Sequence, residues 1–166
     1  MSSSEEEFRP IYHFAPKINW LNDPNGLFYQ DGVYHWFYQY NPEGSQWGNM
    51  SWGHATSEDL VTWTERDVAL PFSAEEQIFS GSIVVDYANT AGFGYGPNGE
   101  APIVAIYTAN IPPQNGEPQD QEQALAYSLD GGYTWEKYDG NPVLDIADPE
   151  FRDPKVFWQD NPGDDD

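Results

Sequence analysis

Two aspartates in the sequence stand directly before a proline and an apolar segment, Asp23 in WLNDPNG and Asp153 in FRDP. Enzymes that split a bond between sugars usually use two carboxyl groups that flank the anomeric carbon. Asp23 is a candidate nucleophile, because the following proline fixes the backbone and the amides of Asn22 and Asn25 can donate to its carboxylate and keep it ionised. The alternative is that Asp-Pro merely starts a strand, since proline tolerates the first strand position.

Asp153 follows Arg152 in the second motif. The fixed positive charge of an arginine favours the ionised form of a neighbouring acid. An ionised aspartate is suited to binding sugar hydroxyls and to stabilising a positively charged transition state, and poorly suited to proton donation. We therefore expect an electrostatic role for Asp153, with a structural ion pair as the alternative role for Arg152.

Four further residues could form the walls of a sugar pocket. Gln39, in QYNP, could bind hydroxyls or cap the end of a strand, and Trp47, in SQWGN, could lie against a sugar face or in the core. Phe79 and Ser80, in FSGS, offer an aromatic edge and a hydroxyl that suit a small polyol. A purely structural role is the alternative for each.

The sequence predicts no cofactor and no metal site. His13, His35 and His54 lack the spacing of a metal-binding motif, so we expect structural roles for them. The segment GFGYGPNG lacks the Lys-Ser/Thr pair and the following helix of a phosphate-binding loop. The chain contains no cysteine, which excludes disulfides and thiolate metal sites.

The charge of the chain indicates which partners it can have. Lys and Arg total 6 against 28 Asp and Glu, a formal net charge of -22, which repels nucleic acid and anionic membranes. No stretch approaches the roughly 18 apolar residues of a spanning helix, and the first residues are polar and acidic rather than those of a signal peptide. We expect a soluble chain whose 7 tryptophans, set among acids and amides, suit carbohydrate as well as a β core.

Glycine and proline recur between segments rich in β-branched and aromatic residues, which predicts an all-β fold. The dipeptide Asp31-Gly32 predicts a tight hairpin. The predicted strands cover residues 27–30, 33–39, 51–57 and 62–69, then 81–87, 103–109, 123–128 and 134–138, and a third group begins at 154–159. Groups of four antiparallel strands are typical of propeller blades.

An internal repeat supports blades. ATSEDLVTW, residues 55–63, and AYSLDGGYTW, residues 126–135, share a small residue, a serine, an aspartate and a tryptophan. Because the innermost strands of a propeller converge on its axis, we expect Asp23 and Asp153 to face one pocket.

In this order, WLNDPNG, QYNP, WGNMSWGHATSEDLVTW, FSGS and FRDP resemble glycoside hydrolase family 32, the β-fructofuranosidases, which include invertases, exo-inulinases and levanases. The resemblance implies a five-bladed propeller followed by a β-sandwich, and a retaining mechanism in which Asp23 attacks the anomeric carbon of a terminal fructosyl unit. It implies that Asp153, with Arg152, stabilises the transition state. The implied fructose-binding positions are Asn22, Gln39, Trp47, Phe79 and Ser80.

One departure concerns the proton donor. The family's acid/base is a glutamate followed by cysteine, and this chain has no cysteine. We therefore expect an N-terminal portion of the enzyme at residues 11–160, about two blades and the first strand of a third, with acidic tails at 1–10 and 161–166. It should bind sucrose or fructan weakly and hydrolyse little, since losing a general acid removes a factor of about 10²–10⁴. The family is usually secreted.

Two alternatives remain open at this point. The chain could be a non-catalytic carbohydrate-binding propeller fragment. It could also be a sialidase-like propeller, because SLDGGYTW resembles an Asp-box hairpin, although three arginines are few for recognising a sialic acid carboxylate. The sequence does not distinguish sucrose from inulin or levan, hydrolysis from fructosyl transfer, or one oligomeric state from another.

Overall fold

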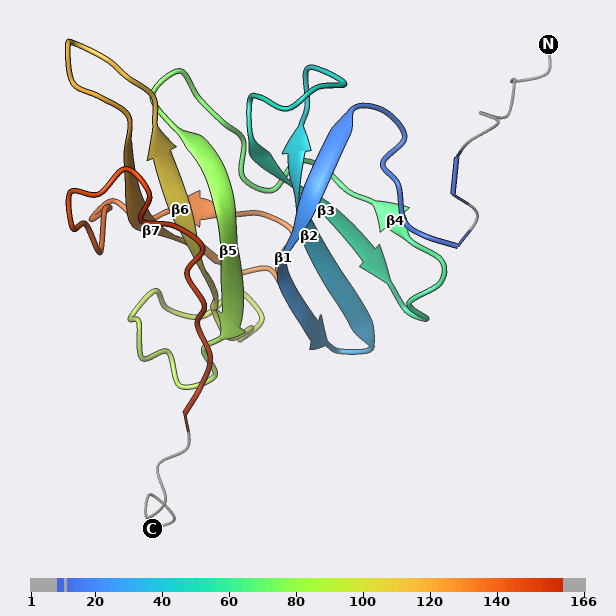
Figure 1. Ribbon diagram of the computed structural model, residues 1–166. Coiled ribbons are helices and arrows are strands. Elements are labelled where there is room, and N and C mark those ends of the chain that lie inside the picture. The colour runs from blue at the N-terminus through green and yellow to red at the C-terminus, as the bar shows by residue number, and fades with distance from the viewer. Residues whose placement is uncertain (1–8, 11, 160–166) are drawn as a thin grey trace.

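The computed structural model describes residues 9–10 and 12–159, and these form two four-stranded antiparallel sheets (Figure 1). In the first sheet the strands follow chain order: β1 (Trp20–Gln30), β2 (Val33–Asn41), β3 (Ser51–Ser57) and β4 (Thr64–Glu65). The second sheet has the same order: β5 (Gln77–Val85), β6 (Ile103–Ile111), β7 (Asp120–Ser128) and β8 (Glu136–Lys137). The predicted all-β fold with two four-stranded groups is confirmed.

The predicted hairpin joins β1 to β2. Gln30 pairs with Val33, and the two residues between them, Asp31 and Gly32, have φ angles of 51° and 87°. Positive φ at both central positions gives a turn whose twist matches that of the flanking strands.

The main hydrophobic core joins the two sheets. Phe37 of β2 and Trp52 of β3 belong to one buried cluster with Ile78 and Tyr107 of the second sheet. Because side chains alternate along a strand, Tyr38 points to the opposite face of β2, where Phe14 covers it with ring centroids 5.1 Å apart. Complete burial of a side chain such as Phe37 is worth about 1.5–3 kcal/mol, so the sheets hold together mainly through this core.

The repeated segments form the same turn in both sheets, before β4 and before β8. The Asp59 carboxylate accepts the backbone N–H groups two and three residues further on, at 2.8 and 2.6 Å. The Asp130 carboxylate accepts those three and four residues further on, at 3.0 and 2.9 Å. The tryptophan that ends each segment, Trp63 or Trp135, donates its indole N–H to the carbonyl three residues earlier, at 3.3 and 3.0 Å. The turns occupy the N–H groups of Thr62 and Thr134, the first residues of the predicted strands at 62–69 and 134–138, so β4 and β8 begin later than predicted. Both strands also end earlier than predicted, at Glu65 and Lys137.

The WLNDPNG motif lies inside β1 rather than before it, because the strand already begins at Trp20. Two register shifts interrupt the pairing of β1 with β2, between Leu21 and Pro24 and between Asn25 and Phe28. Gly26 has a φ of 49°, and a Cβ there would lie 2.5 Å from the end of the Ile83 side chain, so glycine is favoured where β1 approaches β5.

The prediction of a further strand at 154–159 is wrong. This segment runs alongside β5 but forms no strand (Figure 1, in red). Side chains rather than a neighbouring strand bind it: the Val156 N–H donates to Ser82 Oγ at 2.8 Å, and the Trp158 indole donates to the Val85 carbonyl at 2.8 Å. A strand needs a paired backbone ladder, and the described residues supply none on this side of β5.

The predicted acidic tails fall mostly on residues 1–8 and 160–166, which lie outside the described part of the chain. Arg9, within the predicted first tail, is described, and its guanidinium donates to the carbonyls of Pro16 at 3.0 Å and Lys17 at 2.8 Å.

Candidate active site

A cleft of about 360 Å³ lies where β1, β5 and the segment after β8 meet. Its lining contains both predicted acids, Asp23 from the first sheet and Asp153 from the chain beyond the second. The full lining is Asp23, Pro24, Asn25, Gly26, Leu27, Ser80, Gly81, Ser82, Ile83, Asp153, Pro154 and Lys155. The cleft thus brings together two carboxylates that are far apart in the sequence.

The Asp23 carboxylate is exposed, and its Oδ2 accepts a hydrogen bond from the Ser80 hydroxyl at 3.0 Å. The bond comes from β5 rather than from the asparagines beside Asp23, which were the predicted donors. Asn22 Oδ1 accepts instead from the Trp20 indole at 3.0 Å, and buried Asn25 accepts the Gly81 N–H at 3.2 Å. Ser80 therefore orients the candidate nucleophile, while Asn25 ties β1 to β5 beneath it.

Asp153 belongs to the same lining and is exposed, and its backbone is in the left-handed region with a φ of 65°. Its N–H donates to Thr108 Oγ1 at 3.0 Å. Arg152 forms its ion pair with Glu150 and donates to Gln121 Oε1 at 3.3 Å. The hydrogen bond and the charge of Glu150 raise the pKa of the Arg152 guanidinium, and the charge of Asp153 adds to this effect. Arg152 therefore has the structural ion pair that was its alternative role, and Asp153 also lies within reach of its charge.

The remaining predicted sugar-binding residues lie outside the lining of the cleft. Gln39 is 3% exposed, and its amide donates to the Ile78 carbonyl at 2.9 Å, so this side chain connects the two sheets. Trp47 is 58% exposed and meets Phe79 edge to face, with ring centroids 6.1 Å apart. Phe79 precedes Ser80, so this aromatic pair flanks the residue that binds Asp23.

Sequence reasoning missed several residues around Asp153. Lys155 brings a cation into the lining of the cleft, and Ser82, Thr108 and Gln123 bind the backbone of the Asp153 segment. The sequence did contain a signal for Gln123: it belongs to the polar segment DQEQ, which begins a strand whose other residues are mostly apolar.

Two histidines that looked scattered in the sequence lie side by side. His35 Nδ1 is 3.1 Å from His54 Nε2, and Tyr133, in the turn between β7 and β8, packs against both rings. Burial, with a smaller contribution from the Arg66 charge, lowers the pKa of His35 to about 4. Burial, followed by the charges of His35 and Arg66, lowers the pKa of His54 to about 3. Both rings are therefore neutral near pH 7, and they lie between the sheets rather than in the cleft.

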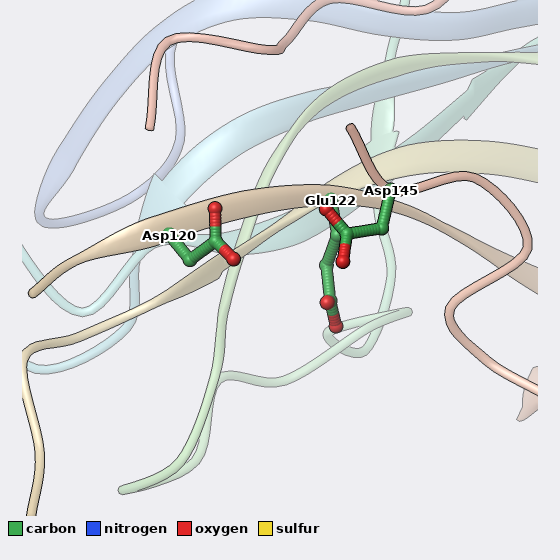
Figure 2. A group of neighbouring side chains, drawn as sticks. All are labelled: Asp120, Glu122 and Asp145. Carbon is green, nitrogen blue, oxygen red and sulfur yellow. The ribbon is translucent and has the colours of Figure 1, made fainter. Parts of the chain in front are cut away.

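Three acids, two on β7 and one in the segment after β8, come close enough to hold a cation in principle. Asp120, Glu122 and Asp145 each place one carboxylate oxygen within 4.8 Å of the others (Figure 2). Burial, and then the neighbouring charges of Asp145 and Asp120, raise the pKa of Glu122. Exposed acidic clusters are common without an ion, and none of these residues lines the cleft, so we assign no metal to them.

Residues 13–164 match the sequence profile described as "Glycosyl hydrolases family 32 N-terminal domain". The chain belongs to glycosyl hydrolase family 32. Its two sheets correspond to part of the family 32 five-bladed propeller. This membership sets aside the sialidase-like alternative.

Several known members of family 32 are similar to the chain over nearly its whole length. The levanase of Bacillus subtilis is 56% identical over 93% of the chain, and an extracellular exo-inulinase of Aspergillus niger is 48% identical over 94%. The crystallised β-fructofuranosidase of Schwanniomyces occidentalis, in complex with fructosyl-erythritol, is 52% identical, with a TM-score of 0.81 over 91% of the chain. The chain spans only 22%, 32% and 29% of these three proteins, respectively.

Among the described residues, no helix is long and apolar enough to cross a membrane. The exo-inulinase named above is extracellular by its description.

Proposed function

We propose that this chain supplies the nucleophile and the transition-state stabiliser of a β-fructofuranosidase, a glycosidase that releases terminal fructose from sucrose or fructans. The observation that carries the proposal is the shared cleft: Asp23 and Asp153 line one cavity, and Ser80 donates to one oxygen of Asp23. Family membership supports the reaction class, and the fructosyl-erythritol complex of a relative supports a fructosyl group as ligand.

In the proposed reaction Asp23 Oδ1 attacks the anomeric carbon of the fructosyl unit. The hydrogen bond from Ser80 holds Oδ2, which leaves Oδ1 available for bond formation. The bond from the anomeric carbon to the leaving oxygen breaks as an ester forms with Asp23 Oδ1, and the leaving oxygen takes up a proton from solvent water. The negative charge of Asp153 stabilises the oxocarbenium-like character of this transition state. Water then cleaves the ester and releases fructose.

The remaining predicted residues take roles around this centre in the proposal. Trp47 and Phe79 form an apolar wall beside Ser80, and Asn22 offers its amide N–H₂ to sugar hydroxyls. Gln39 contributes through the connection that it makes between the sheets.

A fructosyl donor that needs no protonation tests the proposal on the chain itself. Fluoride leaves without a general acid, so β-D-fructofuranosyl fluoride should transfer its fructosyl group to Asp23 and release fluoride with the bonding electrons. Mass spectrometry of acid-quenched protein should find one added fructosyl unit, on the peptide that contains Asp23.

Variants separate catalysis from binding. Asp23→Asn should abolish the adduct, and Asp153→Asn should slow its formation by about 10²-fold or more, the scale on which a single electrostatic stabiliser acts. Absence of any adduct on the wild-type chain, with fructan binding retained in calorimetry, would instead support the non-catalytic binding fragment. An adduct on another residue would contradict the assignment of Asp23.

A further inference from the structure

The backbone at Asp153 adopts a conformation that needs support. A φ of 65° is uncommon for residues other than glycine, although asparagine and aspartate adopt it more readily than most, and it persists where the surroundings favour it. Asp153 lies in a segment that is not a strand, so no backbone ladder holds it. The support has to come from side chains.

Two buried side chains of the second sheet bind the chain on either side of Arg152. Thr108 of β6 is fully buried, and Gln123 of β7 is 2% exposed. They are direct partners across the strands, and the Thr108 hydroxyl donates to Gln123 Oε1 at 3.1 Å. The same hydroxyl oxygen accepts the N–H of Asp153 at 3.0 Å, while Gln123 Nε2 donates to the Phe151 carbonyl at 2.7 Å.

These contacts form one continuous series of hydrogen bonds. It runs from the Asp153 N–H through the Thr108 hydroxyl and the Gln123 amide to the Phe151 carbonyl. The proton of the hydroxyl is committed to Gln123, so its oxygen is free to accept from Asp153. Each group fixes the orientation of the next, which makes the series more rigid than separate contacts would be.

Ser82 of β5 holds the chain on the other side of Asp153. It is 5% exposed, its hydroxyl donates to the Pro154 carbonyl at 3.0 Å, and it accepts the Val156 N–H at 2.8 Å. Buried polar side chains cost free energy unless they are hydrogen-bonded, and these find their partners in the segment that carries Asp153.

We propose that Thr108 and Gln123 are positioning residues that hold Asp153 in place in the cleft that it shares with Asp23. This inference rests on the proposed function and adds to it the residues that fix the geometry of the stabilising carboxylate. They touch the backbone of the Asp153 segment, and so they act through that residue. Misplacing a reacting or stabilising group by about 1 Å can cost roughly 10²-fold in rate, so loss of this support should slow the chemical step.

The test compares two substitutions at one position with a matched control. Thr108→Val removes the hydroxyl while nearly keeping the shape, and Thr108→Ser restores it. Thr56→Val makes the same change at a buried position of β3, where the hydroxyl accepts from Arg66 Nε at 2.9 Å, away from the cleft. Thermal midpoints of all variants report the cost to stability.

With β-D-fructofuranosyl fluoride as the probe, Thr108→Val should lower the maximal rate of adduct formation on Asp23 about 10- to 100-fold. The probe concentration at half-maximal rate should change less than about threefold. Thr108→Ser should recover to within about threefold of wild type, and Thr56→Val should label at the wild-type rate. An unchanged maximal rate in folded Thr108→Val, while the wild type is labelled, would overturn the inference and leave the proposed function standing.

A second measurement does not depend on the reaction. In ¹⁵N-resolved spectra, the amide of Asp153 should shift and exchange with solvent faster in Thr108→Val than in wild type, and it should keep its position in Thr56→Val. An unmoved and equally protected Asp153 amide in Thr108→Val would also overturn the inference. If the wild type is not labelled but this amide responds as expected, the proposed function fails while the positioning contact holds.

Discussion

The neutral histidine pair between the sheets should make the folded chain sensitive to acid. His35 and His54 are both buried, and their folded-state pKa values lie near 4 and 3, against about 6.5 in an unfolded chain. As the pH falls below about 6.5, the unfolded chain takes up protons that the folded chain does not. The stability that the two neutral rings contribute is therefore fully present above about pH 6.5. It is lost as the pH falls from there towards the folded-state pKa values of His35 and His54.

The size of the effect follows from the gap between the pH and the unfolded-state pKa. At pH 5 this gap is about 1.5 units, and each unit is worth about 1.36 kcal/mol, so each ring costs about 2 kcal/mol and the pair about 4 kcal/mol. This value depends little on the folded-state pKa values as long as both lie below 5.

Urea unfolding followed by tryptophan fluorescence at pH 8 and pH 5 measures this loss. His54→Gln should reduce the difference in unfolding free energy between the two pH values by about 2 kcal/mol or more. His13→Gln, at an exposed position, is the matched control and should leave that difference unchanged. Titration of the ring C–H signals of His35 and His54 near pH 6.5 would refute the reasoning, as would a wild-type pH dependence in His54→Gln.

Three further outcomes can be checked by unfolding experiments. Gly81→Ala should destabilise the fold by at least about 1–3 kcal/mol in urea, because its Cβ would lie 2.1 Å from the carbonyl oxygen of Ile106; wild-type stability would show that β5 can move away. Trp52→Phe should lower the free energy of unfolding by about 2–4 kcal/mol, because it opens space in a fully buried site and removes the 3.0 Å hydrogen bond from the indole to the Phe79 carbonyl. A loss below about 1 kcal/mol would contradict this expectation. The chain has a net charge of -22, so its acidic side chains repel one another. Raising the NaCl concentration from about 0.05 to 0.5 M should screen this repulsion and raise the thermal midpoint by several degrees. An unchanged midpoint would show that the repulsion contributes little to stability.

The features predicted best from the sequence are those whose cause is local. Asp31 and Gly32 tolerate positive φ, so the hairpin could be predicted from two residues. The repeated Ser, Asp and Trp pattern predicted equivalent positions in two blades, and it recurs in the structure as a similar turn before β4 and before β8, because each aspartate bonds to backbone N–H groups within a few positions. The meeting of Asp23 and Asp153 in one cleft was predicted by a different argument, the convergence of inner strands on an axis.

The features that were missed depend on contacts between distant parts of the chain. Nothing near Asp23 in the sequence indicates that Ser80, rather than an adjacent asparagine, is its hydrogen-bond donor. Arg152 stands next to Asp153, yet it pairs with Glu150, because a side chain can reach two residues back as easily as one forward. The segment at 154–159 has the composition of a strand, but pairing requires a neighbouring backbone, which composition does not report.

The connections beneath the cleft have a consequence for assembly. Gln39 and Asn25 join the first sheet to the backbone of β5, so Asp23 meets Ser80 only when both sheets are docked. A sugar that bridges the junction binds the docked arrangement alone, and at a hundred times its dissociation constant it would add about 2.7 kcal/mol to the cohesion of the two halves. The ligand would then stabilise the docked arrangement of the two sheets. An increase in protease resistance on adding fructan would measure this stabilisation.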